Sequence, residues 1–167
     1  MEALEQLALA KLAETKNCAQ ASFFALDQHF GLGGSRMVKA LSPFPGIALR
    51  GETCGAATGA MMALGLVFGT ENAEDEAATF AAFAPARELC RRLEDELGST
   101  RCGELLEARV GRPIDFTSPE DLELYRTSGG FQACAKIVTG AVRIAAEIIQ
   151  RDRSATPPES ATQAQNR

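Results

Sequence analysis

Four single cysteines are the residues of this chain best suited to chemistry. Each of them follows a predicted break or cap by a few residues and lies on the apolar face of a predicted helix: Cys18, Cys54, Cys102 and Cys134. A helix N-terminus carries unpaired amide N–H groups and a partial positive charge, which stabilise a thiolate over a thiol. Because the thiolate is the form of cysteine that binds metal, the pattern suggests metal ligands or redox-active thiols.

The spacing of these cysteines does not by itself define a metal site. No two of them share a helical turn, so a common site requires four helices to converge. Zinc ribbons and bacterial ferredoxins instead take their ligands in C-x-x-C pairs. Free cysteine is also among the most buried residue types, so the residues alone leave open that all five cysteines are core thiols.

Cys90 and His29 are predicted to lie outside such a site. Cys90 continues an apolar helical stripe with Phe83 and Leu93, as a small buried thiol would. His29 is the only histidine, and on one helix with Cys18 it would lie about 16 Å away along the axis. A C-x-x-C-H sequence is missing, which excludes covalent haem attachment, and we find no catalytic triad or carboxylate dyad.

The stretch from Gly51 to Gly69, GETCGAATGAMMALGLVFG, is the segment around which the chain is organised. Its pattern predicts a helix that Cys54 opens, with Cys54 pointing inward and residues 58, 61, 65 and 68 on one face. Its G-x-x-x-G spacings predict either close approach of a neighbouring backbone or room for a bound group. From Cys54 to Phe68 it is shorter than the about 20 residues of a membrane span, which favours a buried core helix.

Further helices are predicted on both sides of this segment. Apolar periodicity predicts, in order, one or two helices to about Phe30, a mostly loop segment over 31–50, a helix over about 72–98 with a kink or break at Pro85, a helix from Cys102 to about Gly111, a short helix from Ser118 to about Arg126, and a last helix that has Cys134 near its start. We therefore expect an all-α, compact bundle of about five to six helices. It forms a single domain over residues 1–151, followed by a disordered tail over 152–167.

Composition and charge limit the classes of binding partner and the cellular compartment that we expect for this protein. The net charge of −5 leaves no basic patch, so neither nucleic acid nor an anionic membrane surface is an expected partner. The N-terminus is acidic and amphipathic and shows no export signal, which predicts a cytoplasmic protein with reduced cysteines. The GLGGS segment matches neither common nucleotide-binding glycine motif.

The order of the cysteine motifs resembles the C_GCAxxG_C_C family of redox-active proteins. The resemblance covers about residues 15–145 and rests on NCAQA, CGAATGAMMALGL, GSTRC and CAKIV, whereas Cys90 falls outside it. The family is similar to the helical module of split-Soret cytochromes, which implies an iron-sulfur cluster, 2Fe-2S or 4Fe-4S, held by Cys18, Cys54, Cys102 and Cys134. The small residues Gly55, Ala56 and Gly59 would leave space beside that cluster.

The resemblance implies electron transfer or redox sensing, with a redox partner protein or an oxidoreductase as the partner, and leaves open whether the chain is itself an enzyme. Two alternatives use the same cysteines: thiol-disulfide exchange between pairs of them, and a structural zinc site in a helical interaction module. A homodimer that packs through the region around Phe80 and Phe83 is a further expectation.

Overall fold

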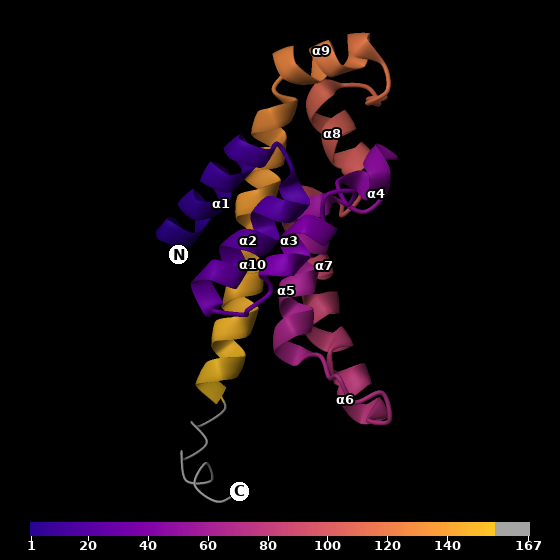
Figure 1. Ribbon diagram of the computed structural model, residues 1–167. Helices are drawn as coiled ribbons and strands as arrows, with labels where there is room; N and C mark the ends of the chain where they lie inside the picture. The colour runs from indigo at the N-terminus through magenta and orange to yellow at the C-terminus, as the bar shows by residue number, and fades with distance from the viewer. Residues whose placement is uncertain (156–167) are drawn as a thin grey trace, which may run out of the picture.

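Helices form the regular structure of the chain in the computed structural model, which describes residues 1–155 (Figure 1). In chain order they are α1 (Glu2–Thr15), α2 (Cys18–Phe30), α3 (Ser35–Ala40), α4 (Gly46–Leu49), α5 (Gly55–Phe68), α6 (Glu76–Ala81), α7 (Phe83–Leu97), α8 (Cys102–Val110), α9 (Pro119–Thr127) and α10 (Gly130–Ala155). The predicted all-α class and single compact domain are confirmed. Seven of the described helices have seven or more residues, slightly more than predicted.

Local signals explain where the extra helices begin and end. Lys16 adopts the left-handed conformation with φ of 54°, and the side chain of Asn17 accepts the Gln20 N–H at 3.0 Å, so α1 ends and α2 begins at this point. The break predicted at Pro85 lies instead at Ala82, between α6 and α7. Pro85 then occupies the first turn of α7, where a helix needs no N–H donor.

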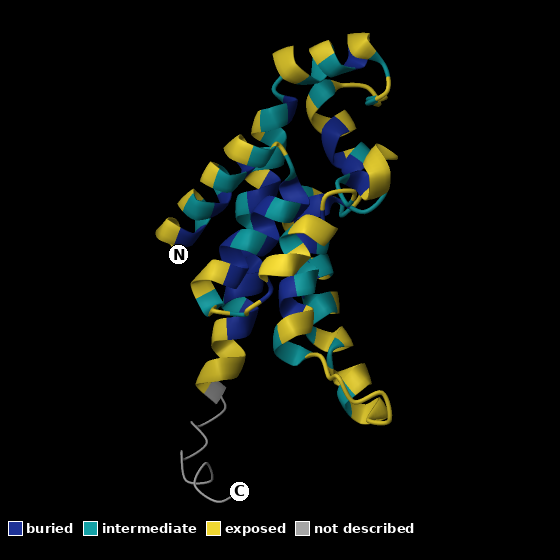
Figure 2. Cartoon of the chain, in the orientation of Figure 1, coloured by how far each residue is buried: buried dark blue, intermediate teal, exposed yellow. Residues whose placement is uncertain are grey.

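Three helices, α2, α5 and α10, form the centre of the bundle, and α1 and α7 pack on its flanks (Figures 1 and 2). The long helix α10 contacts α1, α2, α5, α7, α8 and α9, so it connects the bundle to the end that carries α8 and α9. Its buried residues follow the predicted helical stripe: Ile137, Val138, Ala141, Val142, Ile144, Ala145, Ala146, Ile148 and Ile149.

The buried face of α5 differs from the predicted one. Cys54 points inward as expected, but Gly65 is exposed, and Thr58, Met61 and Phe68 are only half-buried. The fully buried residues are instead Ala56, Ala57, Ala60, Ala63 and Leu64. The helix turns its smallest side chains toward its neighbours because these allow the closest backbone approach.

Glycines of α5 permit that approach at two positions and not at a third. A Cβ at Gly59 would lie 2.2 Å from the carbonyl oxygen of Ala19, and one at Gly55 would lie 2.6 Å from the Cys18 sulfur. The close approach predicted from the glycine spacing therefore occurs between α2 and α5. Gly65 has no atom within 4 Å of its hypothetical Cβ, so its spacing to Gly69 serves no packing contact.

The two ends of the molecule differ from the core. The predicted tail over 152–167 begins inside α10, which continues to Ala155, and residues 156–167 lie outside the described part of the chain. At the opposite end of the bundle from α9, α6 projects away from the core (Figure 1), and Phe80 of α6 and Phe83 at the start of α7 are exposed. The homodimer expected there stays a prediction.

None of the described helices is both long enough and apolar enough to span a membrane.

Replacing Gly59 with alanine should reduce stability, because the added methyl group would collide with the α2 backbone. We expect Gly59→Ala to lower the free energy of unfolding by about 1–3 kcal/mol. The matched variant Gly65→Ala adds the same methyl group to open space in the same helix and should raise it by up to about 1 kcal/mol. Urea unfolding followed by circular dichroism measures both, and a Gly59→Ala protein as stable as the parent would contradict the packing described above.

Candidate functional site: a cavity lined by cysteines

The four single cysteines lie together at the end of the bundle where α8 and α9 join it. Each sits at or near the start of its own helix: Cys18 opens α2, Cys54 precedes α5, Cys102 opens α8 and Cys134 lies in the first turns of α10. Cys18, Cys102 and Cys134 line one cavity of about 520 Å³, and Cys54, which is outside the lining, interacts with Cys18. Four helices thus converge on one group of thiols.

Backbone pairing between two loops places Cys54 beside Cys102. Thr53 and Arg101 form an isolated antiparallel bridge. The Cys54 N–H donates to Thr100 O at 2.8 Å, and the Cys102 N–H donates to Glu52 O at 2.7 Å. The segments that precede α5 and α8 are therefore locked side by side, with one cysteine at the end of each. Sequence reasoning missed this pairing, since a single bridge leaves no alternating apolar pattern.

A left-handed turn covers Cys102. Gly46, Ile47, Ala48 and Leu49 all have positive φ, between 47° and 60°. Left-handed backbone costs a non-glycine residue roughly 1–2 kcal/mol, so other contacts must hold the turn in place. A Cβ at Gly46 would lie 3.2 Å from the Cys102 sulfur, so glycine at this position lets the turn rest on the thiol.

The glycine of the Cys54–Gly55 pair has a direct structural reason. A side chain at Gly55 would fall 2.6 Å from the Cys18 sulfur and 3.0 Å from the Cα of Pro45. Only glycine at this position leaves enough space for the Cys18 thiol. Gly55, Ala56 and Gly59 are absent from the cavity lining, and Gly59 instead allows α2 and α5 to pack.

Part of the cavity wall is aromatic and comes from the loop before α9, from α9 itself and from the start of α10. Phe116, Tyr125 and Phe131 line it, and the Phe116 and Tyr125 rings meet edge to face with centroids 5.4 Å apart. The Tyr125 hydroxyl donates to the Cys134 sulfur at 3.4 Å. Sequence reasoning did not single out Tyr125, and the one signal that could have found it is that it is the only tyrosine of the chain.

A buried carboxylate fixes α9 in this position. Asp121 accepts a hydrogen bond from Arg112 at 2.5 Å and another from the Asp115 N–H at 2.7 Å, while Ser118 caps the helix. The Arg112 guanidinium lowers the pKa of the Asp121 carboxyl, and the Asp115 amide lowers it further. These contacts tie the loop before α9 to the helix that supplies Tyr125.

Two cationic side chains also line the cavity. The Lys16 ammonium lies 4.9 Å from the centroid of the Phe131 ring, and Arg126 forms an ion pair with Glu123 at 3.6 Å. Positive charge at the cavity would favour an anionic occupant.

The cysteine pKa values shift in opposite directions. Hydrogen bonding with Cys18 lowers the pKa of Cys54, and the amides of Ala56 and Ala57 add to this effect against the opposing effect of burial. The same hydrogen bond and then burial raise the pKa of Cys18. Burial is also the main cause for Cys102, whose pKa rises to about 12, and for Cys134, whose pKa rises.

The expectation that every helix start stabilises a thiolate is therefore wrong for three of the four cysteines. At α8 the physical reason is visible in the backbone, because the amides of Cys102 and Gly103 already donate to Glu52 O and Gly51 O. Burial therefore decides the direction of the pKa shift of the Cys102 thiol. Only at α5 do free amides of the first turn point at the cysteine, which is Cys54.

Cys90 and His29 lie away from the cavity. Cys90 is half-buried in α7, and burial raises the pKa of its thiol. His29 is exposed in the last turn of α2, as predicted. Within residues 1–155, no group of three or more histidine, cysteine, aspartate or glutamate side chains is placed so that it could hold a metal ion.

Fold and site together define a small all-helical protein with a buried group of cysteines at a cavity. Residues 16–148 match the family model described as "Putative redox-active protein (C_GCAxxG_C_C)", and the chain belongs to this family. The resemblance seen in the sequence is confirmed. A search of curated proteins found no match, and a search of solved structures found none either.

Cys54 should be the first of the clustered cysteines to ionise. Near-ultraviolet thiolate absorbance of the reduced, metal-free protein, measured against pH, should show one thiol that titrates below the ordinary range, while Cys102 should stay protonated until about pH 12. Cys54→Ser should remove the early step. Cys18→Ala should move it to higher pH because the hydrogen-bond donor is lost. An early step that persists in Cys54→Ser would contradict the assignment.

Proposed function

We propose that Cys18, Cys54, Cys102 and Cys134 bind one iron-sulfur cluster and that the protein transfers electrons or senses redox state. The observation that carries the proposal is the proximity of four cysteines from four helices, with Cys18, Cys102 and Cys134 lining one cavity and Cys54 next to Cys18. Membership of a family described as redox-active supports it. The partner would be a redox protein or an oxidoreductase in the same compartment, for which we propose the cytoplasm.

The cysteines match an iron-sulfur cluster in donor type, and binding would require their side chains to move together, since no ligating arrangement is present among residues 1–155. Iron-sulfur clusters are typically held by four cysteine thiolates, the same donor set as here. Gly46 and Gly55 remove side chains that would otherwise meet the sulfurs of Cys102 and Cys18. The cavity of about 520 Å³ leaves room for a compact inorganic group. When bound, such a cluster supplies reversible one-electron transfer.

The chain's own residues would prepare the site in distinct ways. The pKa of Cys54 is lowered, whereas the pKa values of the other three thiols are raised. Because all four thiols must lose their protons to bind metal, binding of the cluster should strengthen as pH rises. Lys16 and Arg126 would offset the charge of the thiolates. The aromatic wall around Tyr125 would limit the access of water.

Serine at any of the four positions should prevent normal cluster assembly, because a hydroxyl is a much poorer ligand for iron than a thiolate. After anaerobic purification we expect visible absorbance and matched iron and sulfide in the parent protein, and both near background in Cys18→Ser, Cys54→Ser, Cys102→Ser and Cys134→Ser. Cys90→Ser is the matched control and should keep both. Zinc without iron or sulfide in the parent would favour a structural zinc site and contradict the proposal.

Tyr125→Phe should lower the reduction potential of the bound cluster. The hydroxyl donates to the Cys134 sulfur, and such a bond stabilises the more negative, reduced state. We expect a shift of roughly tens of millivolts, on a scale where about 59 mV equals 1.4 kcal/mol for one electron. Phe116→Leu changes the same wall without removing a hydrogen bond and serves as the control in a redox titration. An equal shift in both variants would show that the hydroxyl has no special role.

The contact between Cys18 and Cys54 favours a second candidate function, thiol-disulfide exchange. The interaction between the two thiols shifts their pKa values apart, as in a pair with one nucleophilic thiolate and one resolving thiol. The Cys54 thiolate would attack a substrate disulfide and release one substrate thiolate. Cys18, after losing its proton, would attack the Cys54 sulfur, which leaves a Cys18–Cys54 disulfide and a reduced substrate.

Thiol counting on the metal-free protein distinguishes the two candidates. Incubation with oxidised glutathione should consume two thiols per chain and yield a disulfide-linked peptide pair that contains Cys18 and Cys54 if exchange is the function. The Cys90→Ser protein should behave identically. Loss of other thiols, or unchanged oxidation in Cys54→Ser, would exclude this candidate.

A further inference from the structure

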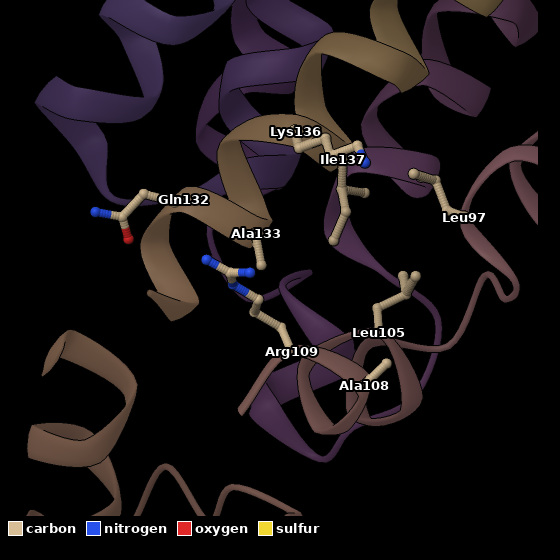
Figure 3. Close-up of a pocket in the computed structure, with 8 residues that line it drawn as sticks. All are labelled: Leu97, Leu105, Ala108, Arg109, Gln132, Ala133, Lys136 and Ile137. Atoms are coloured by element: carbon tan, nitrogen blue, oxygen red, sulfur yellow. The ribbon is translucent and has the colours of Figure 1, made fainter. Parts of the chain in front are cut away.

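A second cavity, of about 340 Å³, lies between α8, the end of α7 and the first half of α10 (Figure 3). Its lining consists of Leu97, Leu105, Ala108, Arg109, Gln132, Ala133, Lys136 and Ile137. None of these residues lines the cysteine cavity, although both cavities use α8 and α10. The second cavity is therefore a separate site on the same two helices.

The lining divides into an apolar floor and a cationic rim. Leu105 and Ile137 are buried, while Arg109 and Lys136 are exposed. In Figure 3 the labelled side chains of α8 lie on one side of the cavity and those of α10 on the other, with the Arg109 guanidinium directed toward Ala133. A ligand held there would touch hydrocarbon from Leu105 and Ile137, and Arg109 and Lys136 would provide positive charge on different sides of the cavity.

The two cations are available to a ligand. Within the described part of the chain, neither Arg109 nor Lys136 has a carboxylate oxygen within 4.0 Å. By contrast, Arg143, which lies two turns further along α10, pairs with both Glu96 and Glu147. Those two carboxylates are thus taken up by another arginine, and the charge at this cavity has no ion-pair partner among the described residues.

The backbone next to Arg109 is shaped to leave room for its guanidinium. A Cβ at Gly129 would lie 3.2 Å from Arg109 Nη2, tighter than an ordinary contact. Gly129 also has φ of 86°, a conformation that L side chains rarely adopt. The turn between α9 and α10 therefore lets the guanidinium lie flat against it, at the edge of the cavity.

We propose that this cavity binds a small organic anion with a short alkyl portion, such as a medium-chain carboxylate or alkyl phosphate. The anionic group would pair with Arg109 or Lys136 at the exposed rim, and the alkyl chain would cover Leu105 and Ile137. The volume is at the lower end of the range of about 300–1,000 Å³ typical of ligand pockets, so the ligand is small. Burial of the alkyl chain supplies most of the binding free energy, and the cations select for negative charge.

Titration calorimetry with the full chain tests the proposal, with or without metal, since no cysteine lines this cavity. Octanoate and octyl phosphate are the probes, and the arm with the lower Kd identifies the preferred head group. Octanol has the alkyl chain without the charge, and acetate has the charge without the chain. We expect saturable binding of one probe molecule per chain, and binding at least about 10-fold weaker for octanol and acetate.

Variants locate the binding to this cavity. Arg109→Gln and Lys136→Gln should each raise the Kd of the preferred probe by about 2–5-fold, the range for exposed charge pairs. Ala108→Phe places a ring in the cavity from an exposed position and should abolish binding while circular dichroism stays unchanged. Arg91→Gln, on the exposed face of α7, is the matched charge control and should bind like the parent.

Three results would overturn the proposal: no saturable binding of either probe to folded protein, octanol binding as tight as octanoate, or full binding retained in Ala108→Phe. A protein that binds the probe but contains no cluster would leave this proposal standing and refute only the iron-sulfur assignment.

Discussion

The contact between α2 and α5 is the packing interaction on which the cysteine site depends. Gly55 and Gly59 bring the two backbones so close that a methyl group at either position would collide with α2. This approach sets Cys18, at the start of α2, against Cys54, at the start of α5. A wider helix pair would separate these thiols and remove the interaction that shifts their pKa values apart.

The second constraint is the backbone pairing that ties α8 to α5. It places Cys102 near the other thiols, but it also takes up the amides at the start of α8. The same hydrogen bonds that create the site therefore deprive Cys102 of the groups that would stabilise a thiolate. The result is an asymmetric group of thiols, in which the pKa of Cys54 is lowered and that of Cys102 is raised to about 12. A metal or an oxidant would meet one prepared sulfur and three protonated ones.

Much of the fold could be predicted from the sequence, because helix periodicity, caps and glycines are local signals. The inward position of Cys54, the cap at Ser118 and the close approach at Gly55 and Gly59 all follow from residues near each other in the chain. The convergence of four cysteines could be expected only through a family pattern, since no two share a turn. Their spacing alone could not exclude that the cysteines are buried core thiols.

Other features of the site escaped prediction because they depend on contacts distant in the sequence. The pairing of Thr53 with Arg101 and the hydrogen bond from Tyr125 to Cys134 have no local pattern. The buried face of α5 was also assigned incorrectly, since a helix with so many small residues carries too little contrast between its faces, and packing against α2 and α10 decides which face is buried.

The left-handed turn over Cys102 has a consequence for how the site can open. Three of its four residues are not glycine and hold an unfavourable backbone conformation, so leaving that conformation releases free energy. This release offsets part of the cost of exposing the surface beneath the turn. Opening of this segment alone would therefore cost less than opening of the core. The bundle of α2, α5 and α10 could therefore keep its structure while the turn lifts away. Access to the Cys102 sulfur is then governed by a short segment of backbone rather than by unfolding of the protein.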